Sequence, residues 1–395
     1  MYLTKEQERM LEGERGYAVS KAMEILVALG KIYGAQRLIE CTSAQISGVS
    51  YKNIGDAGAQ FLWDLAQKGA KVVIPAYINP SAMDLERFDE MALDQRFIEG
   101  QLKILKAYSK MGVKTTLTCT PYHIGVEPSR GEHVAWAESS AVIYANSLLG
   151  AMSNRESGVS ALCSALTGLT PYYGLHLKEN RVATLLVEVK AELLDPVEFA
   201  VLGSLVGRIA SNRIVAFKGI SPDKESLKAM GAALSSTGAV AMFMVERVTP
   251  EWCVEPSAEK ITIEQSEIKE EWERLGGDAT PGDVITIGCP HASLEEIKRV
   301  ALLLKGRRLK KPLYLYTSRI VKSQADNLGL TKIIEEAGGK IFCDTCMVVS
   351  PIDRMGVKSI DVVSAKAAFY SPSMSHVNVR LAKLERLILE STEAM

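Results

Sequence analysis

The fold class follows from three short apolar segments near the C-terminus, DVITIGC (283–289), PLYLYTS (312–318) and KIFCD (340–344). Amphipathic stretches over 293–305 and 319–337 separate them and predict helices. Strands that are joined by helical crossovers pair in parallel, because the crossover returns the chain to the same end of the sheet. We therefore predict a doubly wound α/β unit here, with errors of about 2–4 residues at element boundaries.

The same alternation extends upstream and predicts an α/β protein of several lobes, with mixed and parallel sheets flanked by helices. Predicted strands cover 37–41, 71–76, 113–119, 181–189, 213–217 and 239–244. Predicted helices cover 94–110, 138–152, 196–210, 223–236 and 264–275. The charged, irregular stretch 250–282 is interpreted as a linker between lobes. We expect an N-terminal region at 1–280 and a C-terminal domain at 281–395.

Composition narrows the class of protein. The 395 residues include 46 Lys and Arg against 47 Asp and Glu, a net charge of −1 that argues against nucleic acid as a partner. No apolar run reaches the roughly 18 residues of a membrane span, and the charged N-terminus lacks the apolar core of a signal peptide. We expect a soluble cytoplasmic protein that binds neither a membrane nor nucleic acid.

Three of the seven cysteines end or directly follow predicted strands: Cys119, Cys289 and Cys346. Ligands of open α/β sheets bind outside the carboxyl ends of the strands, so these three thiols can converge on one point. Thiolates are the preferred ligands of iron–sulfur clusters, and a cluster on three cysteines leaves one iron open as a Lewis acid. Plain burial as a small hydrophobe is the ordinary alternative for a free cysteine. Cys163 and Cys253 fit that alternative better. Cys41, which ends the predicted strand 37–41, is either a fourth candidate or part of the core.

Small and polar residues after other strands are candidates for binding an anion. The turn at Gly48, Val49 and Ser50 can expose backbone N–H groups to a carboxylate or phosphate, although it can also be a structural turn. Asn79 can donate and accept hydrogen bonds, and Pro80 fixes its loop, which can equally be a plain turn.

Three further candidates are Glu138, Ser139 and Lys366. Glu138 and Ser139 lie at the start of the predicted helical stretch 138–152, where Glu138 can hydrogen-bond a substrate hydroxyl or act as an acid, and a serine can simply cap the helix. Lys366 lies in the apolar segment SAKAAFY and can supply a positive charge to a site, or can extend to the surface. We expect Glu138, Ser139 and Lys366 to be catalytic.

Seven stretches together resemble the aconitase X family, over about residues 1–385. They are IECTSAQISGVSY (39–51), AYINPSAMD (76–84), TCTPYHIG (118–125), WAESSAVIYANSLLGAMSNRES (136–157), IGCPHAS (287–293), DTCMVVSP (344–351) and VVSAKAAFYSP (362–372). The resemblance implies an aconitase-like fold and a hydro-lyase with a 4Fe–4S cluster on Cys119, Cys289 and Cys346. Ordinary aconitases use a distant cysteine plus a C-x-x-C pair, so Cys343 is an alternative to Cys119. We prefer Cys119, because Cys343 lies inside a predicted strand.

The resemblance also implies a substrate and a partner. The family dehydrates 5-phosphomevalonate, which gives trans-anhydromevalonate 5-phosphate, or cis-3-hydroxy-L-proline. The chain length favours the first activity, in an archaeal mevalonate pathway, and the second is the alternative. The family resemblance places the proton-abstracting serine on a swivelling domain, which in archaea is a separate small subunit. We therefore expect a phosphorylated hydroxy acid as substrate and a small subunit as partner.

Overall fold

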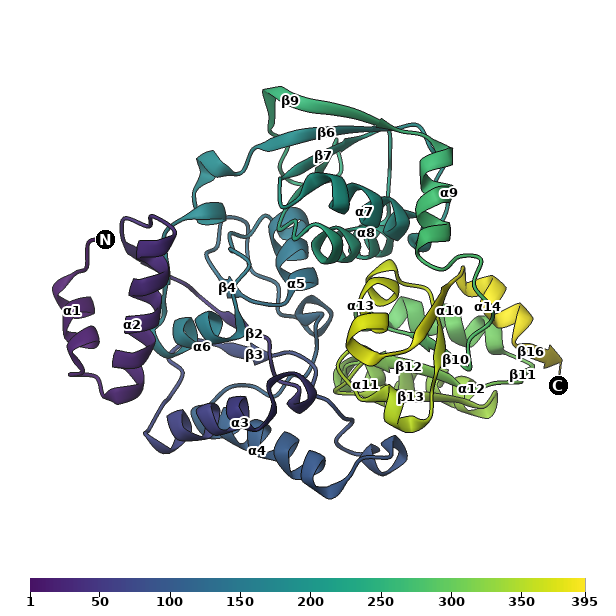
Figure 1. The fold of residues 1–395 in the computed structure, drawn as a ribbon, viewed down its shortest axis with the longest axis horizontal. Coiled ribbons are helices and arrows are strands. Elements are labelled where there is room, and N and C mark those ends of the chain that lie inside the picture. The colour runs from purple at the N-terminus through teal and green to yellow at the C-terminus, as the bar shows by residue number, and fades with distance from the viewer. Residues whose placement is uncertain (395) are drawn as a thin grey trace.

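The structure is a computed structural model that describes residues 1–394, and its C-terminal part contains a five-stranded parallel sheet (Figure 1). The strand order is β13-β12-β10-β14-β15, and every neighbouring pair is parallel. The bounds are β10 Val284–Ile287, β12 Leu313–Thr317, β13 Gly339–Cys343, β14 Ser359–Val362 and β15 Asn378–Leu381. The first three confirm the predicted strands. Chain order reverses between β10 and β14, which marks the place where ligands bind in such sheets.

Helices cover both faces of this sheet. One face packs on α10 (Leu294–Leu304), α11 (Arg319–Asn327), α12 (Leu330–Glu336) and α14 (Leu384–Glu390). The other face packs on α13 (Ala365–Ser375) and shares a core with α7 (Pro196–Ala210) and α8 (Lys224–Thr237). The predicted single helix at 319–337 is two helices, because Gly329 between them has a φ of +71°. Beyond the sheet, β11 (Arg307–Leu309) pairs with β16 (Thr392–Ala394).

A second parallel sheet, ordered β8-β7-β6-β9, lies at the top of Figure 1 with α7 and α8 along its inner face. Its strands are β6 Ala183–Val189, β7 Val215–Lys218, β8 Phe243–Val245 and β9 Val254–Ile263, followed by α9 Gln265–Arg274. Helices cover one face only, so buried and more exposed residues alternate along β6. The predicted linker at 250–282 is wrong, because β9 pairs with β6 over most of its length. Its charge suits an exposed edge strand.

A third parallel sheet is small and lies in the N-terminal region, with β2 between β3 and β4. The strands are β2 Ala44–Ile46, β3 Ala76–Ile78 and β4 Ala135–Trp136, and β1 (Leu38–Glu40) pairs antiparallel with β5 (Leu169–Pro171). The surrounding helices are α1 Lys5–Glu12, α2 Tyr17–Ile32, α3 Tyr51–Gln67, α4 Gln95–Met111, α5 Ser139–Tyr144 and α6 Gly158–Thr167. After α5 the chain continues as a π-helical turn, Ala145–Leu149.

Two predicted strands of this region are largely wrong. The segment 71–76 contributes only Ala76 to β3, since the N–H groups of Val72 and Val73 bond to the ends of α4 and α6. The segment 113–119 runs beside β3 without forming a strand, because Leu117 has a φ of +46° and the Thr116 hydroxyl bonds to both the N–H and the carbonyl of Ile78, leaving the N–H of Thr118 as the one backbone donor of this segment to Ile78. No helix among residues 1–394 is long and apolar enough to span a bilayer.

Candidate active site

The carboxyl ends of two parallel sheets meet at a cavity of about 260 Å³. From the small sheet, Ser47 follows β2, Asn79 and Pro80 follow β3, and Glu138 and Ser139 lie just after β4. From the C-terminal sheet come the ends of β10, β13 and β14, which carry Cys289, Cys346 and Lys366. Cys119 and Arg155 also line the cavity. The structure thus brings together eight of the predicted site residues, and places Ser47 and Arg155 beside them.

Three buried thiols line this cavity, those of Cys119, Cys289 and Cys346. Burial raises the pKa of all three, that of Cys289 to about 12, while the Lys366 ammonium acts in the opposite direction on each. Cys343 is the last residue of β13 and is not among the lining residues, and its N–H donates to Asp84 Oδ2 at 2.6 Å. The geometry therefore favours Cys119 over Cys343 as the third member of the group.

The backbone before Cys289 is fixed by a close approach between strands. Gly288 has a φ of +106°, and a Cβ atom added there would lie 2.1 Å from the carbonyl oxygen of Tyr316. Only glycine fits such an approach without a shift of the backbone. Gly288 therefore sets the point at which the Cys289 loop leaves β10.

The donor set of the cavity fits an iron–sulfur cluster better than a single ion. No group of three or more His, Cys, Asp or Glu side chains in residues 1–394 is close enough to hold one metal ion. The cysteines of a 4Fe–4S cluster each bind a different iron, so they stand farther apart than the ligands of one ion. Three thiols on separate loops around a shared cavity match that requirement.

A buried ion pair joins the two halves of the cavity. Lys366 Nζ donates to Glu138 Oε1 at 2.6 Å, and more weakly to the hydroxyls of Ser140 at 3.2 Å and Ser139 at 3.4 Å. Burial raises the pKa of Glu138, but Lys366 and the hydrogen bonds outweigh it and the net pKa is lowered. The pKa of Lys366 is raised, since Glu138 and the nearby thiols outweigh burial. Both groups are therefore charged at neutral pH.

Ionised Glu138 also caps helix α5. Its Oε2 accepts from the N–H of Ala141 at 2.8 Å and from the Ser140 hydroxyl at 2.6 Å. A serine cap of this helix is therefore wrong, because the carboxylate of Glu138 accepts the hydrogen bond from the N–H of Ala141. As a carboxylate, Glu138 is suited to accept a hydrogen bond from a substrate hydroxyl, and less suited to act as an acid.

A fully buried amide that the sequence did not reveal orients two site residues. Gln45 Nε2 donates to Asn79 Oδ1 at 2.6 Å, and Gln45 Oε1 accepts from the N–H of Glu138 at 2.8 Å. Since Asn79 Oδ1 is used as an acceptor, its Nδ2 group remains as the donor for a ligand. The position of Gln45 in a short buried strand could have indicated this role, because a buried amide needs hydrogen-bond partners for both its nitrogen and its oxygen.

The turn after β2 is close to the cavity but does not line it beyond Ser47. Gly48 has a φ of +74°, Val49 is buried, and the Ser50 hydroxyl donates to the carbonyl of Val349 at 2.9 Å. Within residues 1–394, the N–H groups of Gly48, Val49 and Ser50 donate to no protein acceptor. Three free backbone donors in a turn are able to bind an anion.

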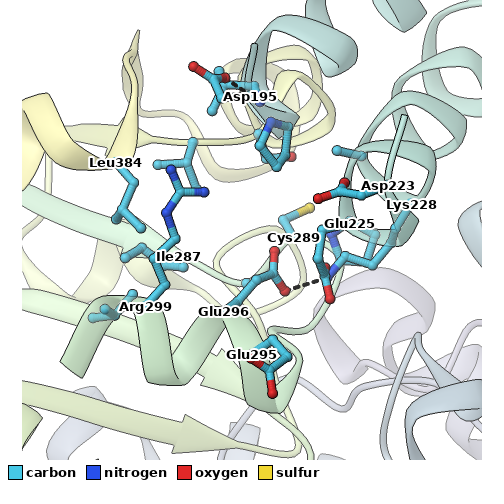
Figure 2. A pocket seen from close by; sticks show the side chains of 18 of the residues that line it. Asp195, Asp223, Glu225, Lys228, Ile287, Cys289, Glu295, Glu296, Arg299 and Leu384 are labelled. Atoms are coloured by element: carbon cyan, nitrogen blue, oxygen red, sulfur yellow. Dashed lines mark hydrogen bonds and ion pairs between the residues drawn. The ribbon is translucent and has the colours of Figure 1, made fainter. Parts of the chain in front are cut away.

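A second cavity, of about 290 Å³, shares Gly288, Cys289 and Pro290 with the first. Figure 2 shows Cys289 at this cavity, with Lys228 beside Glu225 and Glu296. Lys228 Nζ lies 2.8 Å from Glu225 Oε2 and also contacts Glu296, so the buried ammonium is neutralised and links α8 to α10. The charges of Lys228, Glu225 and Glu296 in this second cavity are therefore paired with one another, which is typical of a structural role.

The strand ends of two parallel sheets meet at a cavity that contains three thiols and a buried ion pair. This arrangement is typical of an α/β enzyme. The chain belongs to the aconitase X family: the models of its first, second and third domains match residues 1–179, 183–273 and 282–393. The curated relatives are named dehydratases, and the chain is accordingly a hydro-lyase.

Relatives of two kinds are similar over nearly the whole chain. The phosphomevalonate dehydratase large subunit of Thermococcus kodakarensis is 50% identical and covers 99% of the chain and 100% of that relative. The cis-3-hydroxy-L-proline dehydratase of Hypocrea jecorina is 35% identical, over 98% of the chain and 68% of that relative. The crystal structure of holo-form Thermococcus kodakaraensis aconitase X superposes with a TM-score of 0.93 at 49% identity, over 99% of the chain and 100% of that structure. The predicted aconitase-like α/β fold is confirmed.

Proposed function

We propose that this dehydratase holds a 4Fe–4S cluster on Cys119, Cys289 and Cys346, with one iron free of cysteine. We propose further that it acts in the cytoplasm as the large subunit of a two-subunit enzyme that dehydrates (R)-5-phosphomevalonate to trans-anhydromevalonate 5-phosphate in a mevalonate pathway. The observation that carries the proposal is the shared cavity, which three thiols line together with the Glu138–Lys366 pair. The division at residue 280 then places Cys119 in the N-terminal region and the other two ligands in 281–395.

The reaction removes a β-hydroxyl and an α-proton and leaves a double bond conjugated with the carboxylate. A bound cluster with an open iron supplies Lewis-acid chemistry for the departing hydroxyl. The residues of the chain orient the substrate around it. Glu138 accepts a hydrogen bond from the hydroxyl, and Asn79 Nδ2 donates to the carboxylate. Lys366 can exchange its long bonds to Ser139 and Ser140 for a carboxylate oxygen, because those bonds are the weakest that it makes.

The phosphate is assigned to the free N–H groups of Gly48, Val49 and Ser50, in the turn directly after the lining residue Ser47. Backbone donors in such a turn suit a dianion, and they do not need a lysine or arginine. Pro80 restricts the Asn79 loop on the neighbouring strand end. This assignment predicts that substrates without the phosphate bind more weakly.

The proton-abstracting base is assigned to a serine on the swivel domain of a small subunit. Support comes from the relatives that are 45–50% identical, all of which are named large subunits. The hydroxyproline dehydratases are longer than this chain, which covers 67–68% of them. Since a large subunit implies a small one, a second polypeptide would complete the site.

An anaerobic assay of the chain co-purified with its small subunit tests the proposal on both candidate substrates. We expect turnover of (R)-5-phosphomevalonate, and little turnover by the large subunit alone. Turnover of cis-3-hydroxy-L-proline in place of phosphomevalonate would select the alternative substrate. Full activity of the isolated chain would refute the two-subunit assignment.

A further inference from the structure

One imidazole connects the three loops that carry the thiols of the cavity. His291 is fully buried and lies two residues after Cys289. Its side chain reaches the residue before Cys346 and the residue before Cys119. Its backbone N–H donates to Cys119 Sγ at 3.2 Å. All three loops are therefore in contact with this single residue.

The hydrogen bonds of the ring fix its tautomer. His291 Nε2 lies 2.8 Å from the carbonyl oxygen of Thr345, which can only accept, so Nε2 carries the proton. Nδ1 then accepts from the hydroxyl of Thr118 at 3.0 Å. The same hydroxyl oxygen accepts from the N–H of Thr120 at 3.2 Å and, because its own proton goes to Nδ1, it also accepts from the Thr120 hydroxyl at 3.1 Å. Each ring nitrogen thus binds the loop of a different cysteine.

These loops come from distant parts of the chain, and the bonds to His291 are long-range. Thr118 precedes His291 by 173 residues and Thr345 follows it by 54. The loop at Cys119 is held beside β3 by an isolated bridge at Lys114 and by one backbone hydrogen bond from the N–H of Thr118 to Ile78, and the backbone between them is irregular at Leu117, where φ is +46°. The ring of His291 bonds to the residue before Cys119 and to the residue before Cys346. It can therefore set the distance between these two thiols, which the backbone alone does not fix.

We propose that His291 is a positioning residue for the iron–sulfur cluster, which holds the Cys119 and Cys346 loops in register with its own loop. The proposal rests on the function proposed above, in that the cluster binds the three cysteines. Hydrogen bonds to cluster sulfurs adjust reduction potential, so the N–H donated to Cys119 Sγ also acts on the bound cluster. Outer-shell partners of metal ligands typically change metal affinity by about 10–100-fold when they are removed.

The test uses the full chain, reconstituted anaerobically with iron and sulfide, in three variants. His291→Gln places a donor near the position of Nε2 and keeps the bond to Thr345, whereas His291→Asn places an acceptor near Nδ1 and keeps the bond to Thr118. His291→Phe removes both bonds. The exposed residue His376, changed to Asn, is the matched control. The readouts are iron and sulfide per chain, the rate of loss of the visible absorption in a chelator, and the electron paramagnetic resonance spectrum of the reduced protein.

We expect His291→Phe to lose its cluster at least about tenfold faster than the wild type, with His291→Gln and His291→Asn between them, and His376→Asn unchanged. An altered resonance spectrum in the two amide variants distinguishes positioning from general destabilisation. If the wild type takes up no cluster, the proposed function fails. If the wild type is loaded and all three His291 variants match it in spectrum and in rate of cluster loss, the role of His291 is overturned. If His291→Phe does not fold, the rate of cluster loss and the resonance spectrum of His291→Gln and His291→Asn are compared with the wild type instead. Equality in both readouts would overturn the role of His291.

Discussion

Lys366 and Glu138 form a buried ion pair of 2.6 Å although 228 residues separate them in the chain. Glu138 follows a strand of the N-terminal sheet, and Lys366 begins a helix on the C-terminal sheet. Both side chains line the cavity and both are nearly inaccessible to solvent. The pair therefore fixes the relative position of the two strand-end edges from which the site is built.

The pair should be needed for turnover but not for metal binding. Lys366→Ala should lower the activity of the assembled enzyme by about 10–100-fold, because a buried anion loses a charge-assisted partner worth about 1.5–3 kcal/mol. Its iron content should stay at the wild-type level.

The single variant should also unfold more easily, since breaking a buried pair leaves the charge of Glu138 buried and unpaired at a cost of about 3–5 kcal/mol. The double variant Lys366→Met/Glu138→Gln should recover much of this stability and none of the activity. Near-normal turnover in Lys366→Ala would remove this lysine from the site.

The cysteine assignment predicts which thiols bind iron. Changing Cys119, Cys289 or Cys346 to Ser should each remove most of the iron bound after anaerobic reconstitution, because the cluster loses a ligand that the cavity cannot replace. Cys163→Ser in helix α6 is the matched control, since that thiol is equally buried and lies outside the cavity. Iron analysis and the visible spectrum check the result. Loss of the cluster in Cys343→Ser together with retention in Cys119→Ser would contradict the assignment.

Much of the site could be predicted because its residues follow strands. Periodicity located β10, β12 and β13, and parallel sheets bind ligands at their carboxyl ends, so Cys289 and Cys346 were natural candidates. Asn79 was identified for the same reason, whereas Glu138 was identified by its place at the start of a predicted helix. The strand before Cys119 was wrong, yet its position next to β3 still brings the thiol to the cavity.

Contacts between distant segments could not be predicted from sequence patterns. The roles of Gln45 and His291 depend on partners far away in the chain, and no local spacing shows them. Strand β9 was missed because an exposed edge strand carries charges and lacks a clear hydrophobic alternation. Local patterns report burial and backbone preference, whereas the pairing of buried polar groups is decided by the tertiary fold.

Gln45 should affect substrate binding through Asn79. Gln45→Met keeps the length of the side chain but removes both hydrogen bonds, so the Asn79 amide can rotate and the N–H of Glu138 loses its partner. The lost bonds to buried groups are worth about 1–3 kcal/mol, which predicts a KM higher by about 5–150-fold with unchanged iron content. Gln60→Met on the exposed face of α3 is the control. A KM equal to that of the wild type would show that Asn79 is oriented by other contacts.

Gly288 should be intolerant of a side chain for a steric reason. In Gly288→Ala the new Cβ would meet the backbone oxygen of Tyr316 at 2.1 Å, which forces β10 and β12 apart and displaces Cys289. Gly306→Ala is the control, because Gly306 also has a positive φ, of +72°, and no atom lies within 4 Å of its added Cβ. Both variants carry backbone strain of about 1 kcal/mol, but only Gly288→Ala should lower cluster occupancy. Equal thermal midpoints and equal iron content in the two variants would count against this explanation.

The pH dependence of stability should depend in part on His176. This side chain is fully buried, its Nδ1 lies 3.0 Å from Nδ1 of His133, and burial lowers its pKa to about 3. An unfolded histidine has a pKa of about 6.5 and therefore binds a proton more readily than the folded one. Stability should thus fall as the pH drops below about 6.5, and continue to fall down to the folded pKa.

His176→Leu removes this proton-binding difference. Between pH 7 and pH 5 the wild type should lose about 2 kcal/mol more stability than the variant, since each pH unit below the unfolded pKa contributes about 1.4 kcal/mol. His123 is also buried, with a pKa lowered to about 3 by burial, so His176→Leu should remove only part of the acid sensitivity. Thermal unfolding midpoints at several pH values measure the effect, with His376→Asn as the exposed control. A wild-type and a His176→Leu profile that run parallel through this range would show that His176 is not held neutral by the fold.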